Sequence, residues 1–334
     1  MMDAVSLTCC VVGPGAVGGV LAAALAASGA RVSLLGREGP HLAALRSAGL
    51  TLRVAGGRER SVALPATSDP REIGPVDVVV LAVKATALAA VAPTVGPLLH
   101  PSTVLVPALN GVPWWFLHGA GGPVAGRRLT SLDPAGDLGR HLDPARVLGC
   151  VLHLSASVPA PGLVDRASGR GIILGDATQE TTDRVTPVAE AFTAGGMEVI
   201  VPPGPAGIRQ QVWVKLLGNM SFNPVSALTG ATLEQIANDP GAARLCTAMI
   251  VETAAVGTRL GISVDITPEE RIAMARRLGP VRTSMLQDAD AGRPLELDAL
   301  MGSVSELGDV LDVDTPATDA VLGLLRLREA VRPG

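Results

Sequence analysis

The hydrophobic positions at the start of the chain alternate between short apolar runs and longer mixed stretches. Residues 5–12 and 31–35 are short and mostly apolar, as in strands buried on both faces, and residues 20–26 between them are rich in alanine, as in a helix. Residues 76–83 are almost all apolar and β-branched, which predicts a further parallel strand. Strands and helices in alternation predict an α/β fold with an N-terminal Rossmann-type, doubly wound sheet.

The rest of the first two hundred residues shows less regular hydrophobic patterns. Residues 104–109 predict another buried strand, and residues 50–54 with 61–64 predict a third strand or a hairpin. Beyond them, Gly and Pro punctuate the apolar segments, which predicts short strands that complete the sheet, antiparallel ones included. These segments are residues 147–155, 171–175 and 198–201, with a helix over residues 181–194.

The run Pro202-Pro203-Gly204-Pro205 is the best domain boundary, because apolar residues beyond it recur only with helical spacing. We expect a dinucleotide-binding Rossmann domain over residues 1–203 and an all-helical substrate and catalytic domain over residues 204–334. Pro224 should end the first helix of the second domain near Asn223. Later helices are expected near residues 240–260, 268–291 and 296–312.

A glycine turn lies between the first predicted strand and the first helix. It reads Gly13-Pro14-Gly15-Ala16-Val17-Gly18. In a strand–turn–helix context the first glycine permits the tight turn, the second lets the backbone approach a pyrophosphate, and the third lets the helix pack on the strand. The helix N-terminus offers N–H groups to the phosphates. The motif therefore predicts dinucleotide binding, against the alternative of a purely structural turn.

Two basic residues follow strands at positions where a nucleotide is bound in such folds. Arg37 comes after the second strand and favours NADP, because an arginine suits a 2′-phosphate. The adjacent Glu38 could reverse that preference, and a merely solvated arginine is the structural alternative. Lys84 ends the strand at residues 76–83, at the sheet edge where α/β proteins bind ligands, so we expect it beside the cofactor or the substrate.

Composition narrows the class of protein. The 334 residues are 48% hydrophobic and 17% charged with a net charge of −4, which indicates a globular protein and gives no basic surface for nucleic acid. The four cysteines and five histidines show no metal-ligand spacing, so we expect no metal site and a reducing compartment. No signal peptide or membrane span is evident, and we expect a cytoplasmic protein without a membrane partner.

Lysine and asparagine are scarce, and both cluster in the motifs. Of 27 basic residues only Lys84 and Lys215 are lysine, and lysine is the side chain that can yield a proton where arginine cannot. Lys215, Asn219 and Asn223 follow at i, i+4 and i+8 and lie along one stripe of a predicted helix. A polar stripe of this kind favours catalysis or binding over a solvated face.

Other candidates have equally simple structural explanations. Asn110 ends the strand at residues 104–109 and can bind a ligand there or only form an Asn-Gly turn. Glu296 can act at a site or only favour the start of a helix near Pro294. The cluster Trp114-Trp115-Phe116 can line a pocket or bury its loop against the core.

Taken in order along the chain, these motifs resemble those of the ketopantoate reductases (2-dehydropantoate 2-reductases). The resemblance covers almost the whole chain. It rests on Gly13-x-Gly15-x-x-Gly18, Gly36-Arg37, Val83-Lys84-Ala85, Leu109-Asn110-Gly111, Trp213-x-Lys215-Leu216-x-x-Asn219-x-x-x-Asn223-Pro224, Ser284-Met285-x-Gln287-Asp288 and Glu296-x-Asp298. Where the pantoate enzymes often carry a further substrate-binding Asn, this chain has Ala231-Thr232-Leu233.

The resemblance implies NADPH-dependent reduction of 2-dehydropantoate to pantoate, in pantothenate and coenzyme A biosynthesis, with the active site between a Rossmann and a helical domain. It implies Lys215 as the catalytic acid, Glu296 as an acid at the active site, and Arg37 and Lys84 as cofactor residues. Asn219, Asn223 and Ser284 are expected on the substrate, and Asn110 at both cofactor and substrate. Alternatives are a related reductase for another 2-oxo acid and a non-enzymatic NADP sensor. A homodimer is expected by analogy alone.

Overall fold

The computed structural model describes residues 7–178, 180–181 and 183–331. Contacts divide the chain into two compact units. The first holds the residues up to Leu109 together with Leu138–Ile208, and the second holds Asn110–Asp137 together with the residues from Arg209 onward. The domain boundary that the sequence predicts after residue 203 stays a prediction. Residues 5 and 6 of the first predicted strand, and residue 182 of a predicted helix, lie outside the described residues.

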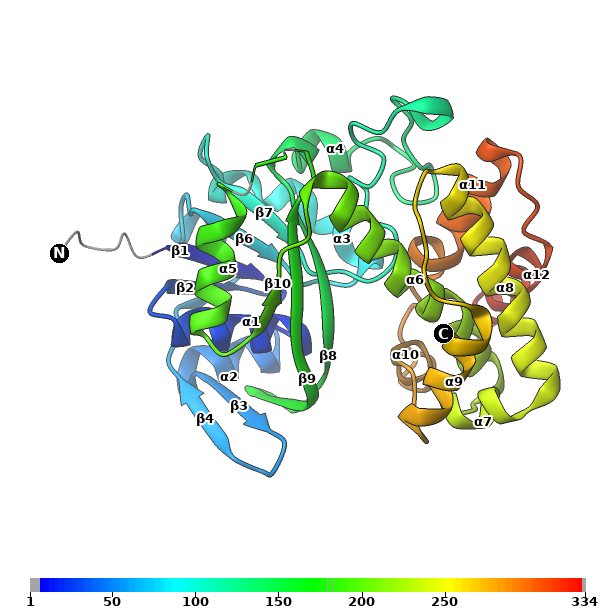
Figure 1. The fold of residues 1–334 in the computed structure, drawn as a ribbon. Coiled ribbons are helices and arrows are strands. Elements are labelled where there is room, and N and C mark those ends of the chain that lie inside the picture. Colours follow the sequence, from blue (N-terminus) through cyan, green and yellow to red (C-terminus); the bar gives the residue numbers. More distant parts are fainter. Residues whose placement is uncertain (1–6, 179, 182, 332–334) are drawn as a thin grey trace. The chain divides into compact units, whose positions relative to one another are not determined.

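Five parallel strands form the first sheet of the first unit, in the order β5-β2-β1-β6-β7. Numbered along the chain within this sheet, that is the 3-2-1-4-5 order of a Rossmann fold. Figure 1 labels four of these strands, β2, β1, β6 and β7. In the register of the central strand, Cys9 pairs with Val32 on one side and Val78 on the other. The predicted parallel sheet is confirmed. Its strands are β1 (Thr8–Val12), β2 (Arg31–Leu35), β5 (Ala66–Thr67), β6 (Val78–Leu81) and β7 (Val104–Pro107).

A second sheet holds the remaining strands of this unit. The expectation that short strands complete the first sheet is wrong: β8 and β9 form an antiparallel hairpin of 13 and 14 residues, and β9 also pairs in parallel with β3 and β10. The half of β8 nearest the turn and the middle of β9 are largely exposed, so no continuous apolar run reveals the length of either strand. The other strands are β3 (Leu50–Val54) and β4 (Glu59–Val62), which form the predicted hairpin, and β10 (Glu198–Ile200), beside β8 (Leu148–Ala160) and β9 (Leu163–Asp176).

Helix α1 (Ala16–Ala27) packs between the two sheets, against β1 and β2 on one side and β3, β8 and β9 on the other (Figure 1). All residues from Gly18 to Leu25 are buried. A Cβ added at Gly19 would come within 2.6 Å of the Val164 side chain, so β9 packs on this helix at close range. Because protein covers it on both sides, α1 is apolar all round, and its N-terminus is fixed beside the end of β1.

Shorter helices complete the first unit. The α-helices are α2 (Pro40–Ala48), α3 (Ala85–Val91), α4 (Leu138–His141) and α5 (Val185–Ala194). Single 3₁₀ turns lie at Pro70–Glu72, Ala92–Thr94, Gly96–Leu98 and Pro144–Arg146.

In the described part of the second unit every regular element is a helix, as predicted, and loops connect these helices. Its helices are α6 (Gly204–Thr229), which begins in the first unit, α7 (Leu233–Asn238), α8 (Pro240–Arg259), α9 (Pro268–Leu278), α10 (Ser284–Asp290), a π-helical turn (Asp298–Gly302), α11 (Ser303–Leu311) and α12 (Pro316–Ala330), with a 3₁₀ turn at Gly122–Val124. Within the described residues, no helix is both long enough and apolar enough to cross a membrane.

Two helix predictions are wrong, one in where the helix ends and one in its continuity. Helix α6 runs through Pro224 to Thr229 instead of ending near Asn223. Residues 221–227 around this proline are all buried, so packing outweighs the hydrogen bond that the proline cannot donate. The helix expected over residues 268–291 is interrupted, because Gly279 adopts a φ of 75° at the end of α9 and Pro280 follows it.

Candidate functional site

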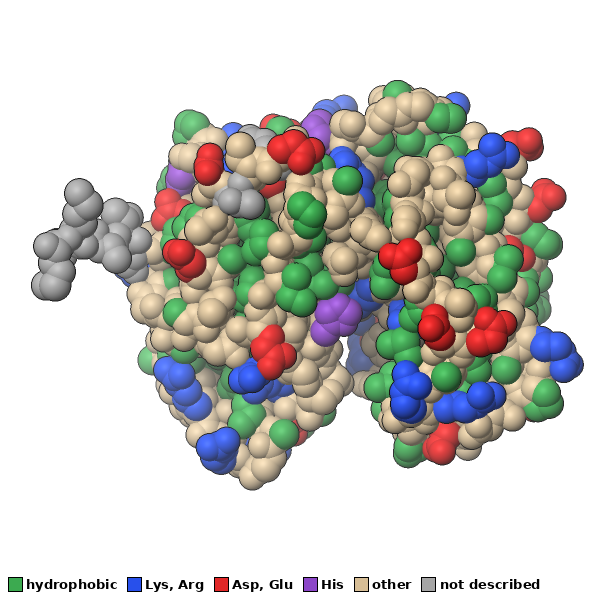
Figure 2. Space-filling model, viewed as in Figure 1, with side chains coloured by type: hydrophobic (Ala, Val, Ile, Leu, Met, Phe, Trp, Pro, Cys, Tyr) green, Lys and Arg blue, Asp and Glu red, His purple; other side chains and the backbone are tan. Residues whose placement is uncertain are grey.

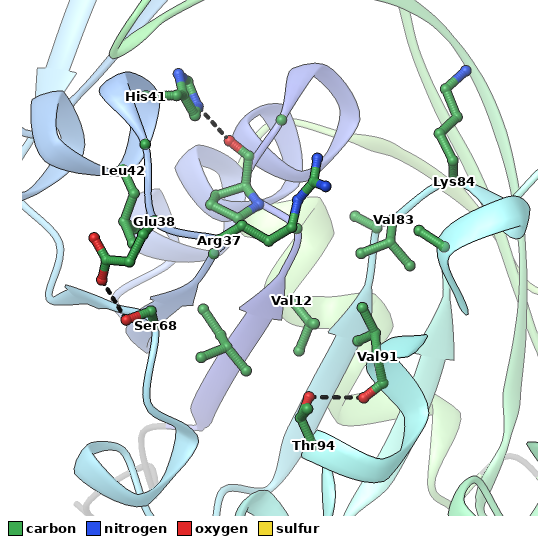
Figure 3. Close-up of a pocket in the computed structure, with 18 of the residues that line it drawn as sticks. Val12, Arg37, Glu38, His41, Leu42, Ser68, Val83, Lys84, Val91 and Thr94 are labelled. Atoms are coloured by element: carbon green, nitrogen blue, oxygen red, sulfur yellow. Dashed lines mark hydrogen bonds between the residues drawn. The ribbon is translucent and has the colours of Figure 1, made fainter. Parts of the chain in front are cut away.

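A pocket of about 760 Å³ lies over the glycine turn of the first unit (Figure 3). Its floor is formed by Val12, Gly13 and Gly15, and its rim by residues after β2 and β6. These are the carboxyl ends of neighbouring parallel strands, where open α/β sheets bind their ligands. The volume is in the range of small-molecule and cofactor sites.

The three glycines of the turn differ in what an added Cβ would contact. Gly13 has a φ of 85°, and an added Cβ would lie 2.7 Å from the Val83 side chain. A Cβ added at Gly18 would lie 2.2 Å from the Gly13 carbonyl oxygen, so this glycine allows the helix to pack on the turn. At Gly15, by contrast, an added Cβ meets nothing within 4 Å. The protein itself does not require a glycine there, which fits a backbone that a ligand must approach closely.

The first turn of α1 follows Gly15, and no side chain caps it in the described structure. It also carries no acidic residue. The N–H groups of a helix start are unpaired within the helix and carry the positive end of its dipole, so an anionic group is the partner that they favour. The open face at Gly15 and this uncapped helix start fit the pyrophosphate of a dinucleotide.

The corner of the pocket next to α2 is charged. Glu38 accepts hydrogen bonds from Arg46 at 2.8 and 3.0 Å and another from the Ser68 hydroxyl. The hydrogen bonds of Arg46 and then of Ser68 lower the pKa of Glu38. Arg37 is exposed at the same rim, and in the described part of the chain no carboxylate pairs with it. Arg46 thus neutralises the Glu38 carboxylate locally, whereas the charge of the Arg37 guanidinium is not compensated by any described residue.

The predicted cofactor residues divide between the two units. Gly13, Pro14, Gly15, Arg37 and Lys84 line the pocket, with Lys84 exposed at the start of α3 (Figure 3). Ala16, Val17 and Gly18 form the first turn of α1. Asn110, by contrast, lies in the second unit.

Lys215 and Asn110 come together within the second unit, although 105 residues separate them. The Lys215 Nζ donates a hydrogen bond to the Asn110 Oδ1 at 2.9 Å. Lys215 lies on α6, and Asn110 lies at the start of the loop that runs to Asp137. An ammonium has three donors, so the amide oxygen fixes the direction of one of them and thereby the direction of the whole group.

A close backbone contact holds the Asn110 loop in place. Gly111 has a φ of 82°, and an added Cβ would lie 2.3 Å from the carbonyl oxygen of Ala299 in the π-helical turn. The next residue, Val112, donates its N–H to that same oxygen at 2.7 Å. No larger residue fits at position 111, so the Asn-Gly pair has a packing role as well as a polar one. π-Helical turns are rare and occur frequently at functional sites.

The remaining predicted substrate residues also lie in the second unit. Asn219 and Asn223 follow Lys215 along α6. Asn219 is partly buried, and Asn223 is only 8% exposed. Ser284 is the first residue of α10 and is exposed. Glu296 directly precedes the helical turn at Leu297 and is 7% exposed, whereas Pro294 lies before the helix and not in its first turn as expected.

Aromatic packing anchors the loop that begins at Asn110. Trp115 and Phe116 are each 1% exposed, and Phe116 stacks on Trp213 of α6 with ring centroids 5.6 Å apart. Arg209 donates to the carbonyls of Phe116 and His118, and its burial lowers its pKa. Of the two interpretations of the Trp114-Trp115-Phe116 cluster, burial of the loop describes Trp115 and Phe116, and Trp114 is partly exposed.

Three pocket features were missed by sequence reasoning. They are the Arg46–Glu38 pair, the Ser68 hydroxyl, and His41, which hydrogen-bonds the glycine turn at Pro14. Arg46 is eight residues from Glu38 and Ser68 is thirty, so no local spacing reveals them. No group of three or more His, Cys, Asp or Glu side chains that could hold a metal occurs among the described residues.

Comparison with known protein families covers nearly the whole chain. Residues 9–179 match the family described as ketopantoate reductase PanE/ApbA, and residues 207–329 match its C-terminal counterpart. The chain belongs to the ketopantoate reductase family. It is therefore an oxidoreductase, and the resemblance seen in its motifs is confirmed.

Individual members of this family align end to end with the chain. A 2-dehydropantoate 2-reductase from Mesorhizobium japonicum is 43% identical over 324 residues, which are 97% of this chain and 98% of that protein. A crystal structure assigned as a ketopantoate reductase from Ralstonia solanacearum MolK2 is 42% identical, with a TM-score of 0.91 over 98% of this chain and 99% of that one. The ternary structure of D-mandelate dehydrogenase with NADH and anilino(oxo)acetate shares the fold, with a TM-score of 0.81 at 20% identity over 97% of this chain and 98% of that one.

Proposed function

We propose that the protein is an NADPH-dependent reductase that converts 2-dehydropantoate to pantoate. The observation that carries this proposal is the hydrogen bond between the Lys215 ammonium and Asn110 in a chain of the ketopantoate reductase family. The Asn110 amide carries no charge, so this hydrogen bond orients the Lys215 ammonium without neutralising it. Such a group can both attract a carbonyl oxygen and give it a proton.

The pocket over the glycine turn is the proposed dinucleotide site. A reduced nicotinamide, when bound, would supply the hydride that a ketone carbon accepts. Gly15 and the first turn of α1 would hold the pyrophosphate, and Arg37 would hold a 2′-phosphate. NADPH is proposed over NADH because Glu38, the residue that could instead accept from a 2′-hydroxyl, is already bound by Arg46 and Ser68.

Lys215 is the proposed acid of the reaction. Reduction of a ketone builds negative charge on its oxygen, and a lysine ammonium stabilises this charge and then donates the proton. Asn110 would orient the ammonium throughout. Asn219, Asn223 and Ser284 would offer neutral donors to the substrate carboxylate and hydroxyl, and the buried Glu296 would accept from its polar hydrogens.

A different 2-oxo acid is the second candidate substrate, and one feature favours it. The segment after Asn223-Pro224 carries Ala231 and Thr232 instead of a further amide side chain. Thr232 is engaged in a capping box with Gln235 at the start of α7, so it supports that helix. A 2-oxo acid with a less polar side chain would not need an amide hydrogen-bond partner at positions 231–232.

Steady-state turnover with a panel of substrates tests the proposal. The purified protein should oxidise NADPH faster than NADH, with the highest kcat/KM on 2-dehydropantoate among short, branched and aromatic 2-oxo acids. A higher kcat/KM on another member of the panel would favour the second candidate. NADPH binding by fluorescence without turnover on any 2-oxo acid would instead indicate a sensor, and would contradict the reductase.

A further inference from the structure

His41 joins the glycine turn to a segment of the second sheet. It lies in the first turn of α2, is half-buried and lines the pocket. Its Nε2 is 2.7 Å from the Pro14 carbonyl oxygen, and its Nδ1 is 3.1 Å from the N atom of Gly162 (Figure 3 shows the first of these contacts). Gly162 is in the turn between β8 and β9.

These two contacts fix the protonation state of the imidazole. The Gly162 N–H can only donate, so Nδ1 must be the unprotonated acceptor. The Pro14 carbonyl can only accept, so Nε2 must carry the hydrogen. His41 is therefore a neutral imidazole of one tautomer, with both nitrogens committed.

The Gly162 side of this bridge is firmly held. The Gly162 carbonyl accepts from the Thr51 N–H of β3 at 2.9 Å, which ties the hairpin turn to a strand. Gly162 has a φ of 77°, and an added Cβ would lie 3.1 Å from the Cβ of Ala44 in α2. The backbone of the turn is thus fixed by a sheet and by helix packing, and it is a rigid anchor for the imidazole.

The Pro14 side is the part that touches the proposed cofactor site. Pro14 is buried, and a Cβ added at Gly36 would lie 3.3 Å from its ring. Its carbonyl belongs to the same peptide plane as the Gly15 N–H, which donates to the Gly13 carbonyl at 2.8 Å. A hydrogen bond to the Pro14 oxygen therefore fixes the plane of the peptide that leads into the N-cap of α1.

We propose that His41 is a positioning residue for the dinucleotide, which holds the Pro14–Gly15 peptide in its binding orientation through Nε2 and takes its own position from Gly162 through Nδ1. The inference rests on the proposed dinucleotide function. It predicts that cofactor affinity depends on the hydrogen bond from His41 Nε2 to the Pro14 carbonyl. Of the two His41 hydrogen bonds, only this one involves the residues that would approach the pyrophosphate.

Two amide substitutions separate the two bonds. A glutamine amide nitrogen reaches the place of Nε2, so H41Q keeps a donor for the Pro14 carbonyl. An asparagine amide reaches only the place of Nδ1, so H41N keeps an acceptor for the Gly162 N–H and loses the donor to Pro14. H41A removes both. As a matched control, H141A makes the same change at an exposed histidine of α4.

The readouts are the Kd of NADPH by fluorescence titration, KM and kcat with the best 2-oxo acid, and the melting temperature of the full chain. We expect the Kd and KM of NADPH to rise roughly two- to tenfold in H41N and H41A, the worth of one hydrogen bond. They should stay close to wild type in H41Q and H141A, with kcat at saturating NADPH unchanged in all four. Melting temperatures should fall in H41Q as well as H41N, since each loses one bond.

Three results would overturn the inference. They are equal Kd values for H41Q and H41N, a Kd in H41A equal to that of wild type, and a loss confined to kcat. If H41A does not fold, the comparison of H41Q with H41N decides alone. A wild-type protein that binds no dinucleotide overturns the proposed function and this inference together, whereas wild-type binding with unaffected variants overturns only the role of His41.

Discussion

At the scale of single residues, the proposed chemistry depends on position 215 being a lysine and not an arginine. The chain uses arginine for nearly all of its positive charge, yet position 215 holds a lysine whose ammonium donates to Asn110. A guanidinium can supply charge at that point but no proton, because arginine stays protonated in proteins. The contribution of proton donation can therefore be separated from that of charge by substitution.

Lys215→Ala and Lys215→Arg should both lower kcat, by about 10²–10⁴-fold for alanine, because general acid catalysis is lost in each. Arginine should recover part of the loss in KM for the 2-oxo acid but little of the loss in kcat. Steady-state kinetics on the two variants, with the Kd of NADPH unchanged as the control for folding, would measure this. A kcat for Lys215→Arg near that of wild type would show that charge alone suffices.

The proposed preference for NADPH over NADH also depends on single side chains. Arg46 neutralises Glu38 at the rim of the pocket. Arg46→Ala should leave the Glu38 carboxylate without a counter-charge beside the proposed site of the 2′-phosphate, so the KM of NADPH should rise several-fold more than that of NADH. The ratio of kcat/KM for the two cofactors is the measurement. Arg71→Ala, which removes an exposed partner of Asp69, is the control and should leave the ratio unchanged.

At the scale of elements, one carboxylate fixes a loop to a helix in the second unit. Glu306 of α11 accepts from the N–H and hydroxyl of Thr130 and from the N–H of Ser131, at 2.7 to 2.8 Å. This ties the far end of the Asn110 loop to a helix. Burial alone would raise the pKa of Glu306, but the hydrogen bonds from Ser131 and Thr130 outweigh it and the pKa is lowered.

Glu306→Gln should reduce the free energy of unfolding by about 1 kcal/mol near neutral pH, since hydrogen bonds to a charged acceptor are lost and the site is partly solvated. The folded-state pKa of Glu306 lies below its unfolded value, so its contribution is present above the unfolded pKa and is lost as pH falls through the folded one. Urea unfolding of both proteins across that acidic range should show the two curves converging. A constant difference would contradict the assignment.

At the scale of the whole molecule, the sequence predicts those features that neighbouring residues determine. It does not predict features that depend on contacts between distant residues. Helix α1 and four strands of the first sheet, β1, β2, β6 and β7, could be predicted because each is an apolar run, whereas the two-residue strand β5 was not predicted. The course of α6 through Pro224 was not, since only the surrounding packing overrides the proline. Lys215 and Asn219 were found by helical spacing, whereas His41 was not, because its two partners lie 27 and 121 residues away.

Burial across the molecule also sets the reactivity of its thiols. Cys9, Cys10, Cys150 and Cys246 are all buried, and burial raises the pKa of Cys9, Cys10 and Cys246 to about 12. Few thiolates exist at mildly alkaline pH, so a thiol reagent should label the native protein far more slowly than the unfolded chain. Labelling followed with and without denaturant measures this. Rapid labelling of a native cysteine would show that its region opens locally.

The two lysines have a practical consequence for work on this protein. Lys84 is exposed and lines the proposed nucleotide pocket, and Lys215 is half-buried on α6. Amine-directed dyes, cross-linkers and sensor-chip coupling chemistries choose among the accessible amines, so among the lysines they will attach first at Lys84 and obstruct that pocket. Immobilisation through an engineered tag, or coupling in the presence of saturating dinucleotide, leaves Lys84 unmodified. Any weak dinucleotide binding then measured is a property of the protein and not of the coupling.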